Sequence, residues 1–199
     1  DDEPDRLPFV TLGQRLADAA DAALTAALAV ACTSVYGGPD DEDRKPPARL
    51  AVLAMGKCGA RELNYISDVD VVYVHDIVDP FGGEDGHEPI DDDRAAVLAT
   101  ALASGTARAV MSNGPEAPLW ELDANLRPEG KDGPLSRTLD SHVRYYRKWA
   151  KSWEFQALLK ARPIAGSADL GARYLERIWP RVWESSAREG FVDSVRAMR

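Results

Sequence analysis

The chain has 199 residues, of which 24 are Lys or Arg and 33 are Asp or Glu, giving a formal net charge of −9. This length provides one hydrophobic core, or two small subdomains that share one. The acidic balance argues against a protein that grips nucleic acid through a broad basic face. Any phosphate is therefore expected to be bound locally, by bound cations and a few Arg or Lys side chains.

The first half of the chain alternates predicted helices with predicted strands. Apolar residues at helical spacing predict helices over 11–35 and 94–112, the second capped by the acids that precede it. Short apolar runs predict strands over 49–56, 68–77 and 118–130. This part is expected to form a mixed α/β core.

The second half, from residue 137 onward, is expected to be helical. Apolar side chains at alternating steps of four and three predict one continuous stripe, formed by Leu139, Val143, Tyr146, Ala150, Trp153 and Ala157. The stretch PIAGSAD, residues 163–169, predicts a turn, and the Trp and Tyr residues of 145–183 are expected in the helical core. The chain is thus divided into an α/β core with its N-terminal helix, residues 1–136, and a helical subdomain, residues 137–199.

Other features bear on the setting of the protein. We find no apolar run long enough to span a membrane and no signal peptide. Cys32 and Cys58 lack metal-ligand spacing, so two free thiols in a reducing cytoplasm are expected. Because the chain lacks an initiator Met, we expect it to be part of a longer protein.

Two aspartates stand at the start of the second predicted strand. Because side chains on a strand alternate between faces, Asp68 and Asp70 share one face, about 6–7 Å apart along the strand. Without a counter-charge they repel each other, which raises the pKa of one of them. A divalent cation removes that cost, and ligands that are all oxygen favour Mg²⁺ or Mn²⁺ over zinc. The alternative is that Asp68 caps a turn and Asp70 is a solvated strand residue.

A third carboxylate is expected from the strand at 118–130. In the sequence LWELDANL, apolar side chains alternate with a polar face that contains Asp123. If this strand pairs with the one that begins at Asp68, Asp123 completes a cluster of three carboxylates. Such a cluster can hold two metal ions, which clamp the attacking and leaving oxygens of a phosphoryl group in line.

The residues upstream of the aspartates suggest a phosphate contact. Gly56 ends the first strand, and together with Gly59 it frames a turn whose backbone N–H groups can approach a phosphate. Lys57 and Ser67 would flank that phosphate. The alternative is a simple strand-to-helix turn.

Several stretches resemble known families. A strand ending in Gly, a short helix, an Asp-hydrophobic-Asp-hydrophobic pattern and a later lone Asp are similar to the polymerase-β-type nucleotidyltransferases, although Lys57 stands where that superfamily usually has Ser or Gly. GKCGARELNYISDVDVVYV, LDANLRPEGKDGPL and YYRKWAKSWEFQALLKARPIAG closely resemble the bifunctional glutamine synthetase adenylyltransferase/adenylyl-removing enzymes. The resemblance covers residues 49–199 in order.

This resemblance implies a fold and an activity. The implied fold is α+β, with a polymerase-β-like nucleotidyltransferase core (a small mixed sheet with flanking helices) followed by a helical subdomain. The family protein holds two such units: the N-terminal copy is implied to remove AMP from a tyrosine of glutamine synthetase with phosphate, giving ADP, and the C-terminal copy to add AMP from ATP. The motifs are more similar to the removing copy. The adding activity and a catalytically silent nucleotide-sensing or docking module are the alternatives.

The resemblance also implies ligands and partners. Asp68, Asp70 and Asp123 become the catalytic residues and the ligands of Mg²⁺ or Mn²⁺, with two ions expected. Both reactions displace a group at the same phosphorus, so these aspartates do not reveal the direction. The implied partners are glutamine synthetase, phosphate and ADP or else ATP, and, for the full-length enzyme, a PII-type nitrogen signalling protein.

Four further side chains have two interpretations each, and one loop has a hypothetical role. Arg127 either reaches a substrate phosphate or pairs with a nearby acid. Lys160 and Arg162 either hold phosphate or satisfy the dipole and the last carbonyls of a helix. Glu154 either contacts the nucleotide region or packs at an interface. The expected loop 78–93 is a hypothetical recognition surface for the protein substrate.

Overall fold

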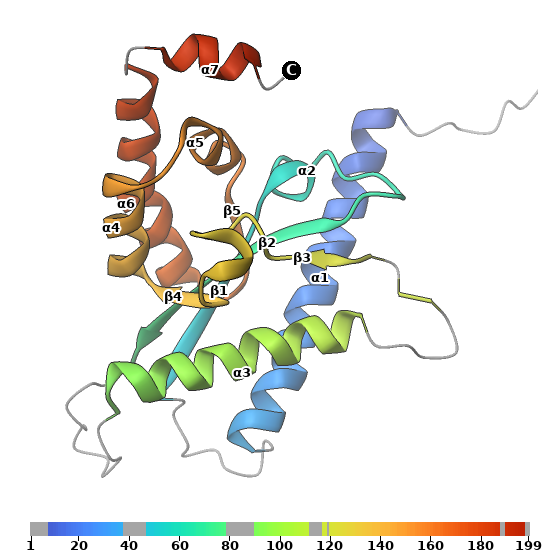
Figure 1. Cartoon of the computed structure of the whole chain (residues 1–199). Helices are drawn as coiled ribbons and strands as arrows, with labels where there is room; N and C mark the ends of the chain where they lie inside the picture. The colour runs from blue at the N-terminus through green and yellow to red at the C-terminus, as the bar shows by residue number, and fades with distance from the viewer. Residues whose placement is uncertain are drawn as a thin grey trace, which may run out of the picture.

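The computed structural model describes residues 8–37, 47–78, 90–111, 117–118, 120–187 and 190–197. Figure 1 shows helices arranged around a small central sheet. In chain order the elements are α1 (Phe9–Tyr36), β1 (Ala48–Ala54), α2 (Gly56–Gly59), β2 (Val69–Ile77), α3 (Asp92–Val110), β3 (Leu122–Asp123), the 3₁₀ helix η1 (Gly130–Asp132), β4 (Ser136–Thr138), α4 (Leu139–Lys148), α5 (Ser152–Leu158), β5 (Arg162–Gly166), α6 (Ala168–Ser186) and α7 (Phe191–Ala197). The fold is mixed α+β, as expected, and is consistent with a nucleotidyltransferase-like core.

The strands form one mixed sheet in the order β3-β2-β1-β5, with β4 also paired to β2. β1 is antiparallel to both β2 and β5. β3 and β4 both run parallel to β2, β3 beside its first residues and β4 further along it. β2 is therefore the central strand, and β3 is the strand that lies beside its first residues.

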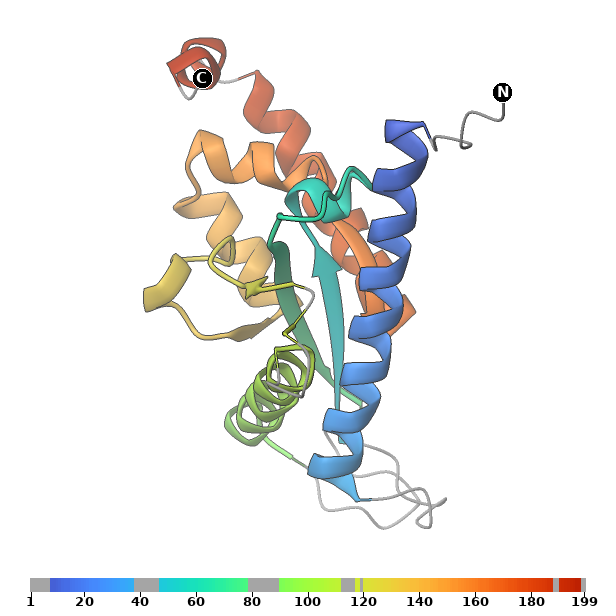
Figure 2. The same ribbon diagram turned by 90° about the vertical axis from the view of Figure 1, so that its right-hand side faces the viewer.

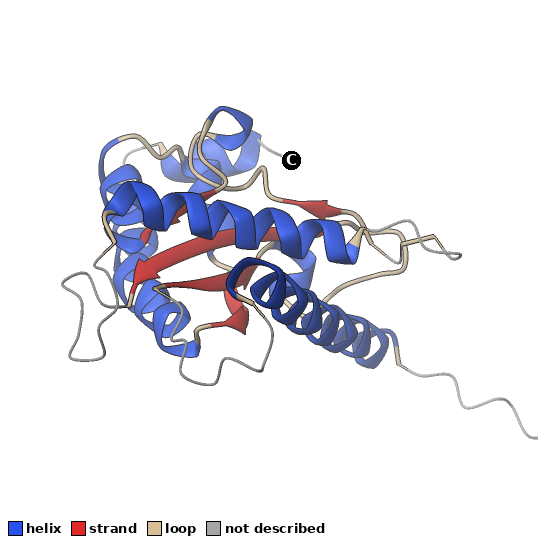
Figure 3. Cartoon of the chain, turned by 90° about the horizontal axis from the view of Figure 1, so that it is seen from below, coloured by secondary structure: helices blue, strands red, loops and turns tan. Residues whose placement is uncertain are grey.

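Alternate side chains of β2 enter two different hydrophobic cores. Val69, Val71 and Tyr73 pack in a core that includes residues of α1 and α3. Val72 and Val74 pack on the opposite face, in a core that includes residues of α4, α5 and α6. Figures 2 and 3 show the strands between these two sets of helices. Burial on both faces explains why the strand reads as a nearly continuous apolar run after its acidic start.

The helices predicted in the first half are confirmed. The one expected over 11–35 is α1, and the one expected over 94–112 is α3. The side chain of Asp91 accepts a hydrogen bond of 2.8 Å from the backbone N–H of Arg94. An acid therefore caps α3 as predicted, where its charge also complements the helix dipole.

The strands of the first half are confirmed in part. Those expected over 49–56 and 68–77 are β1 and β2, but the strand expected over 118–130 is reduced to the two residues of β3. The chain turns soon afterwards, and Glu129 and Gly130 both adopt left-handed conformations, with φ of 64° and 57°. A strand cannot continue through such conformations. The alternation of apolar residues that the sequence shows as far as Leu126 therefore does not form a longer strand paired with β2.

The second half is not helical throughout, which corrects the expectation for 137–199. Arg162–Gly166 form strand β5 in place of the predicted turn, because their backbone pairs with β1. β5 lies at the edge of the sheet, where Pro163 can be tolerated although it lacks an N–H donor. Pro and Gly here mark an edge strand and not a turn. The division of the chain into two domains at residue 136 stays a prediction.

The continuous apolar stripe is also interrupted, since α4 ends at Lys148 and α5 begins at Ser152. Tyr146 and Tyr174 are buried as predicted, but four tryptophans are at least 40% exposed, which makes the prediction of a Trp-rich core wrong: Trp149, Trp153, Trp179 and Trp183. In α6 the buried stripe includes Ile178 and Val182, and each exposed Trp follows one residue later. One residue is about 100° around a helix, enough to leave the buried face.

Helix α1 corrects a second expectation. It is long and apolar enough to cross a membrane by length and composition alone. A helix of a soluble core passes the same test, and the buried side of α1, with Leu24 and Leu28, packs in the core shared with β2. The two cysteines, Cys32 and Cys58, are free thiols, as predicted. Residues 79–89 of the expected loop 78–93 lie outside the part of the chain that the structure describes.

Candidate active site

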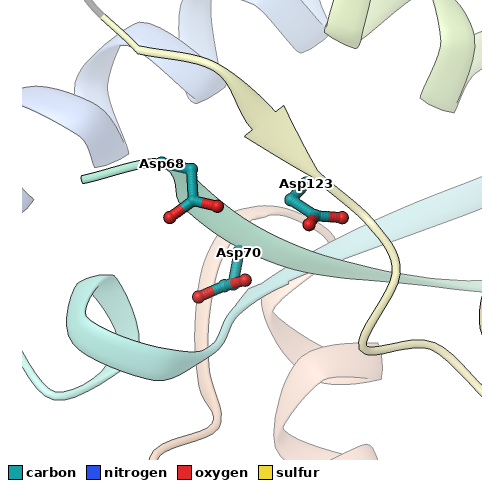
Figure 4. A group of neighbouring side chains, drawn as sticks. All are labelled: Asp68, Asp70 and Asp123. Atoms are coloured by element: carbon teal, nitrogen blue, oxygen red, sulfur yellow. The ribbon is translucent and has the colours of Figure 1, made fainter. Parts of the chain in front are cut away.

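Three aspartates, from β2, from the residue just before it and from β3, lie together at one end of β2 (Figure 4). Asp68 immediately precedes β2, and Asp70 lies within it, directly opposite Asp123 of β3 in the parallel register. One carboxylate oxygen of each residue lies within 4.8 Å of the other two. The predicted strand pairing is confirmed, and it brings the three carboxylates together.

Local hydrogen bonds set the positions of these strands. The backbone N–H of Val69 donates to the carbonyl of Glu121 at 2.8 Å, which fixes the register of β2 against β3. The side chain of Asp123 accepts a bond of 2.7 Å from the backbone N–H of Asn125, forming a turn just after the strand. Asp123 is thereby held in place by the chain that follows it.

The electrostatics of the cluster are those of crowded acids. The pKa of Asp70 is raised to about 6, first by burial and then by the negative charges of Asp68 and Asp123, while the Lys57 ammonium acts in the opposite direction. A divalent cation would turn these repulsions into attraction, and carboxylate oxygens are the ligands that Mg²⁺ and Mn²⁺ prefer. The residues present therefore fit the ion that the sequence resemblance implies. Within the part of the chain that the structure describes, no other three acidic, His or Cys side chains come this close together.

Gly56 packs directly against the cluster. Its φ of +52° lies in the left-handed region, and a Cβ added to it would lie 2.3 Å from Oδ2 of Asp70. The preceding residue, Met55, donates its backbone N–H to the carbonyl of Asp70 at 2.9 Å. Both the backbone conformation and the lack of space require glycine here. A phosphate contact at this turn stays a prediction.

Lys57 and Ser67 lie beside each other, while their predicted contact with a phosphate stays a prediction. The Lys57 ammonium donates to the Ser67 hydroxyl at 3.0 Å, and that hydroxyl donates to the side-chain oxygen of Asn64 at 2.7 Å. Ser67 is buried, whereas Lys57 is exposed. This chain of bonds fixes the loop that leads into Asp68 and keeps a positive charge near the carboxylates.

Comparison with known proteins now decides the family. A family model described as glutamate-ammonia ligase adenylyltransferase matches residues 5–177. The chain belongs to this family. Similar curated proteins are named bifunctional glutamine synthetase adenylyltransferase/adenylyl-removing enzyme. That of Mycobacterium tuberculosis (strain H37Rv) is 52% identical over 100% of the chain, and that of Mycolicibacterium smegmatis is 54% identical over 97% of it. The chain spans only 17% of the length of each of these relatives.

In this adenylyltransferase-family chain, two of the predicted phosphate-contacting residues have structural partners. A Cβ on Gly59 would lie 2.0 Å from the carbonyl oxygen of Lys160, so glycine permits close packing there. Arg162 forms a two-pronged ion pair with Asp21 of α1, at 2.5 and 3.1 Å. It also donates to the carbonyls of Cys58 and Gly59 in α2. Arg162 thus satisfies carbonyls at a helix end, one of its two interpretations, although the helix is α2. Phosphate roles for both residues stay predictions.

The other two basic candidates also have protein partners. Arg127 donates to three carbonyls of its own loop, the shortest bond being 2.8 Å to Ala124. None of these three partners is an acid, so among the described residues the bonds that shape the turn after β3 stand where an ion pair was one of the two interpretations. Lys160 pairs with Glu62 at 2.9 Å. Phosphate contacts by these residues likewise stay predictions.

Glu154 is a helix cap. Its side chain is 5% exposed and accepts a bond of 2.7 Å from the backbone N–H of Lys151, at the start of α5. This capping bond is a structural role that neither interpretation named, and a contact of Glu154 with the nucleotide region stays a prediction.

Sequence reasoning missed a cleft beside the cluster. It has a volume of about 420 Å³ and lies between the loop 65–68 on one side and Pro118, Trp120 and Glu121 on the other. Asn64, which stands three residues before Ser67, is a local signal for a fixed turn in that loop. No local signal indicates that Trp120 faces the loop, because this depends on the pairing of β2 with β3.

Proposed function

We propose that this chain removes AMP from an adenylylated tyrosine of glutamine synthetase by metal-dependent phosphorolysis. The observation that carries the proposal is the cluster of Asp68, Asp70 and Asp123 in a chain of the adenylyltransferase family. The name of these relatives covers both the adding and the removing activity. The choice of the removing activity rests on the similarity of the chain's motifs to the N-terminal copy of the family protein.

The proposed reaction is a single displacement at phosphorus. An oxygen of inorganic phosphate attacks the phosphorus of the tyrosine-linked AMP, the bond from that phosphorus to the tyrosine oxygen breaks, and ADP forms. The tyrosine leaves as a phenolate and takes a proton from water. Because a phenol has a pKa of about 10, it can leave without a dedicated acid. Phosphate is already an anion at neutral pH and needs no base to activate it.

The chain's own residues would prepare the site for this displacement. Asp68, Asp70 and Asp123 would hold the divalent ions, which when bound neutralise the phosphoryl oxygens and the leaving oxygen. The pairing of β2 with β3 fixes the spacing of the carboxylates, and the missing side chain of Gly56 leaves room for Asp70. Lys57, held by Ser67, supplies a positive charge on the same side.

An end-point assay tests the proposal. The chain is incubated with adenylylated glutamine synthetase and Mg²⁺, with or without phosphate, and ADP and protein-bound AMP are measured. We expect ADP only when phosphate is present, and its loss in Asp123→Asn. Asp132→Asn, an exposed carboxylate in η1, is the matched control and should retain the activity.

Two other results would replace the proposal. Transfer of label from ATP to unmodified glutamine synthetase, without phosphorolysis, would make the chain an adenylyltransferase. Nucleotide binding with no turnover in either direction would point to a sensing or docking module. Both results would leave the family membership unchanged.

A further inference from the structure

Two large apolar side chains next to the cluster are unusually exposed. Tyr65 is 70% exposed, and Ile66, at 96%, is the most exposed large hydrophobic residue among those that the structure describes. They are neighbours in the loop that leads into Asp68. Isolated surface apolar residues need no explanation, but an adjacent pair at the rim of a cleft is typical of an interaction surface.

The loop that carries them is held in a defined conformation. The side-chain oxygen of Asn64 accepts bonds from the backbone N–H of Ile66, at 3.3 Å, and from the hydroxyl of Ser67, at 2.7 Å. Lys57 adds the bond to Ser67 described above. The apolar pair is therefore presented on a loop that is already ordered, which lowers the entropy cost of binding a partner.

The pair borders the cleft of about 420 Å³, and the cleft adjoins the reacting groups. Its second wall contains Trp120, which is only 7% exposed and fixes that wall in the core below. The backbone bond from Val69 to Glu121 joins the two walls. Asp68 belongs both to the cleft and to the carboxylate cluster, so a ligand in the cleft has one end at the proposed site of reaction.

The charge of the cleft indicates the kind of ligand. Among the described residues that line it, two are carboxylates, Asp68 and Glu121, and none is a Lys, Arg or His. Lys57 contacts Ser67 but does not line the cleft. Because Asp68 would hold a divalent ion, Glu121 is the carboxylate that gives the rest of the cleft its charge. Glu121 suits a basic side chain of a polypeptide, and Tyr65 and Ile66 suit an apolar one nearby.

We propose that this cleft binds the segment of the protein substrate that flanks the modified tyrosine, an inference that rests on the proposed function. The tyrosine-linked AMP lies at the carboxylate cluster, and the adjoining polypeptide runs through the cleft. An apolar side chain of the substrate packs against Tyr65 and Ile66. A basic side chain of the substrate lies near Glu121.

The test compares two substrates that share the reacting bond. One is adenylylated glutamine synthetase, and the other is a small ester, N-acetyl-tyrosinamide linked to AMP through its phenol oxygen. For each variant the quantity measured is the ratio of kcat/KM for the protein to kcat/KM for the ester, with phosphate and Mg²⁺ held constant. Tyr65→Ser and Ile66→Ser change exposed side chains, so the fold is retained. Val97→Ser, on α3 and 68% exposed, is the matched control.

We expect Ile66→Ser to lower this ratio by about tenfold or more, mainly through the KM for the protein. Glu121→Gln should lower it by about two- to fivefold, an effect that added salt reduces. Val97→Ser should leave it unchanged. These results together would support a docking site for the protein substrate.

Four results would overturn the inference. An unchanged kcat/KM for the protein in both Ile66→Ser and Tyr65→Ser would show that the pair does not contact the protein substrate. An equal loss on both substrates would make the cleft a subsite for the nucleotide. A wild-type chain that releases no ADP from either substrate would overturn the proposed function, and the docking site with it. A wild-type chain that is active on the ester but not on the protein would overturn the docking site and leave the proposed chemistry intact.

Discussion

Two aspartates on one face of β2 are held in opposite electrostatic states. Asp70 and Asp76 are both half-buried. Burial and the charges of Asp68 and Asp123 raise the pKa of Asp70 to about 6. Burial acts in the same direction on Asp76, yet hydrogen bonds and charges from Arg173 and Arg49 outweigh it and lower the pKa of this carboxyl below its ordinary value.

The difference lies in the neighbours that each carboxylate has. Asp76 lies 2.7 Å from Arg173 of α6 and 3.3 Å from Arg49 of β1, and Arg173 also contacts Asp169 at 3.1 Å. These pairs connect α6 to the sheet. Asp70 instead faces two other acids. Arginine side chains neutralise the carboxylate at one end of β2, whereas crowded acids raise the pKa of Asp70 at the other end, a contrast that is typical of a functional site.

The largest effect on binding or stability that this comparison predicts is on metal binding. Asp70→Asn should weaken Mn²⁺ binding by about 100-fold or more, because it removes one of three charged ligands. Asp76→Asn is the matched control, since it makes the same chemical change at the opposite end of the same strand. Isothermal titration calorimetry measures both. Equal affinities of the two variants for Mn²⁺ would contradict the different roles given to Asp70 and Asp76.

A methyl group placed beside Asp70 should have the next largest effect. Gly56→Ala puts a Cβ 2.3 Å from Oδ2 of Asp70 and strains a φ of +52°. We expect phosphorolysis to fall by about 10- to 100-fold, because the carboxylate must move. Gly130→Ala has a similar φ of +57°, but its Cβ would have 3.5 Å to the nearest atom. This control should lose stability without a comparable loss of rate, and equal rate losses would contradict the role given to Gly56.

The raised pKa of Asp70 predicts how metal binding depends on pH. The folded chain binds this proton more tightly than the unfolded chain, whose carboxyl has the ordinary pKa of 3.8. In the absence of metal, ionised Asp70 therefore lowers the free energy of unfolding above pH 6. The lost stability is regained as the pH falls from about 6 to 4, because the carboxyl of the folded chain then takes up its proton. Protons then compete with Mg²⁺, so its affinity should fall by about tenfold per pH unit below pH 6. The increase in Tm caused by Mg²⁺ should be larger at pH 7 than at pH 5, and a pH-independent increase would count against this assignment.

The smallest expected effect is on stability. Asp76→Asn should lower the free energy of unfolding by about 1 kcal/mol, because its ion pairs are partly exposed and screened by solvent. The lowered pKa means that this stability is present above the ordinary pKa of 3.8 and is lost as the pH falls through the lower value in the folded chain. Urea denaturation at pH 7 measures it. Asp70→Asn should leave the metal-free chain equally stable or more stable, and a loss as large as that of Asp76→Asn would argue against the comparison.

Local sequence rules predicted the carboxylate cluster because each step of that prediction is local. The alternation of a strand puts Asp68 and Asp70 on one face, and a second short strand with the same alternation supplies Asp123. One long-range assumption, the pairing of those two strands, was enough to complete the site, and the structure confirms that pairing.

Features that depend on long-range contacts escaped prediction. β5 contains Pro163 and Gly166, residues that indicate a turn unless the partner strand is known. The exposed tryptophans of α6 lie one residue off its buried stripe, and composition alone does not reveal which residues face the sheet. The cleft joins residues near 65 to residues near 120, so its existence follows only from the folded arrangement.

The most direct test of the central claim measures phosphate-dependent release of ADP from adenylylated glutamine synthetase by Asp70→Asn and Asp76→Asn. Both variants are assayed with Mg²⁺ at a temperature where circular dichroism shows them folded. The proposal predicts that Asp70→Asn loses at least about 1000-fold in rate, while Asp76→Asn stays within a few-fold of the unmodified chain. Equal rates in the two variants would show that the carboxylate cluster is not the centre of the reaction.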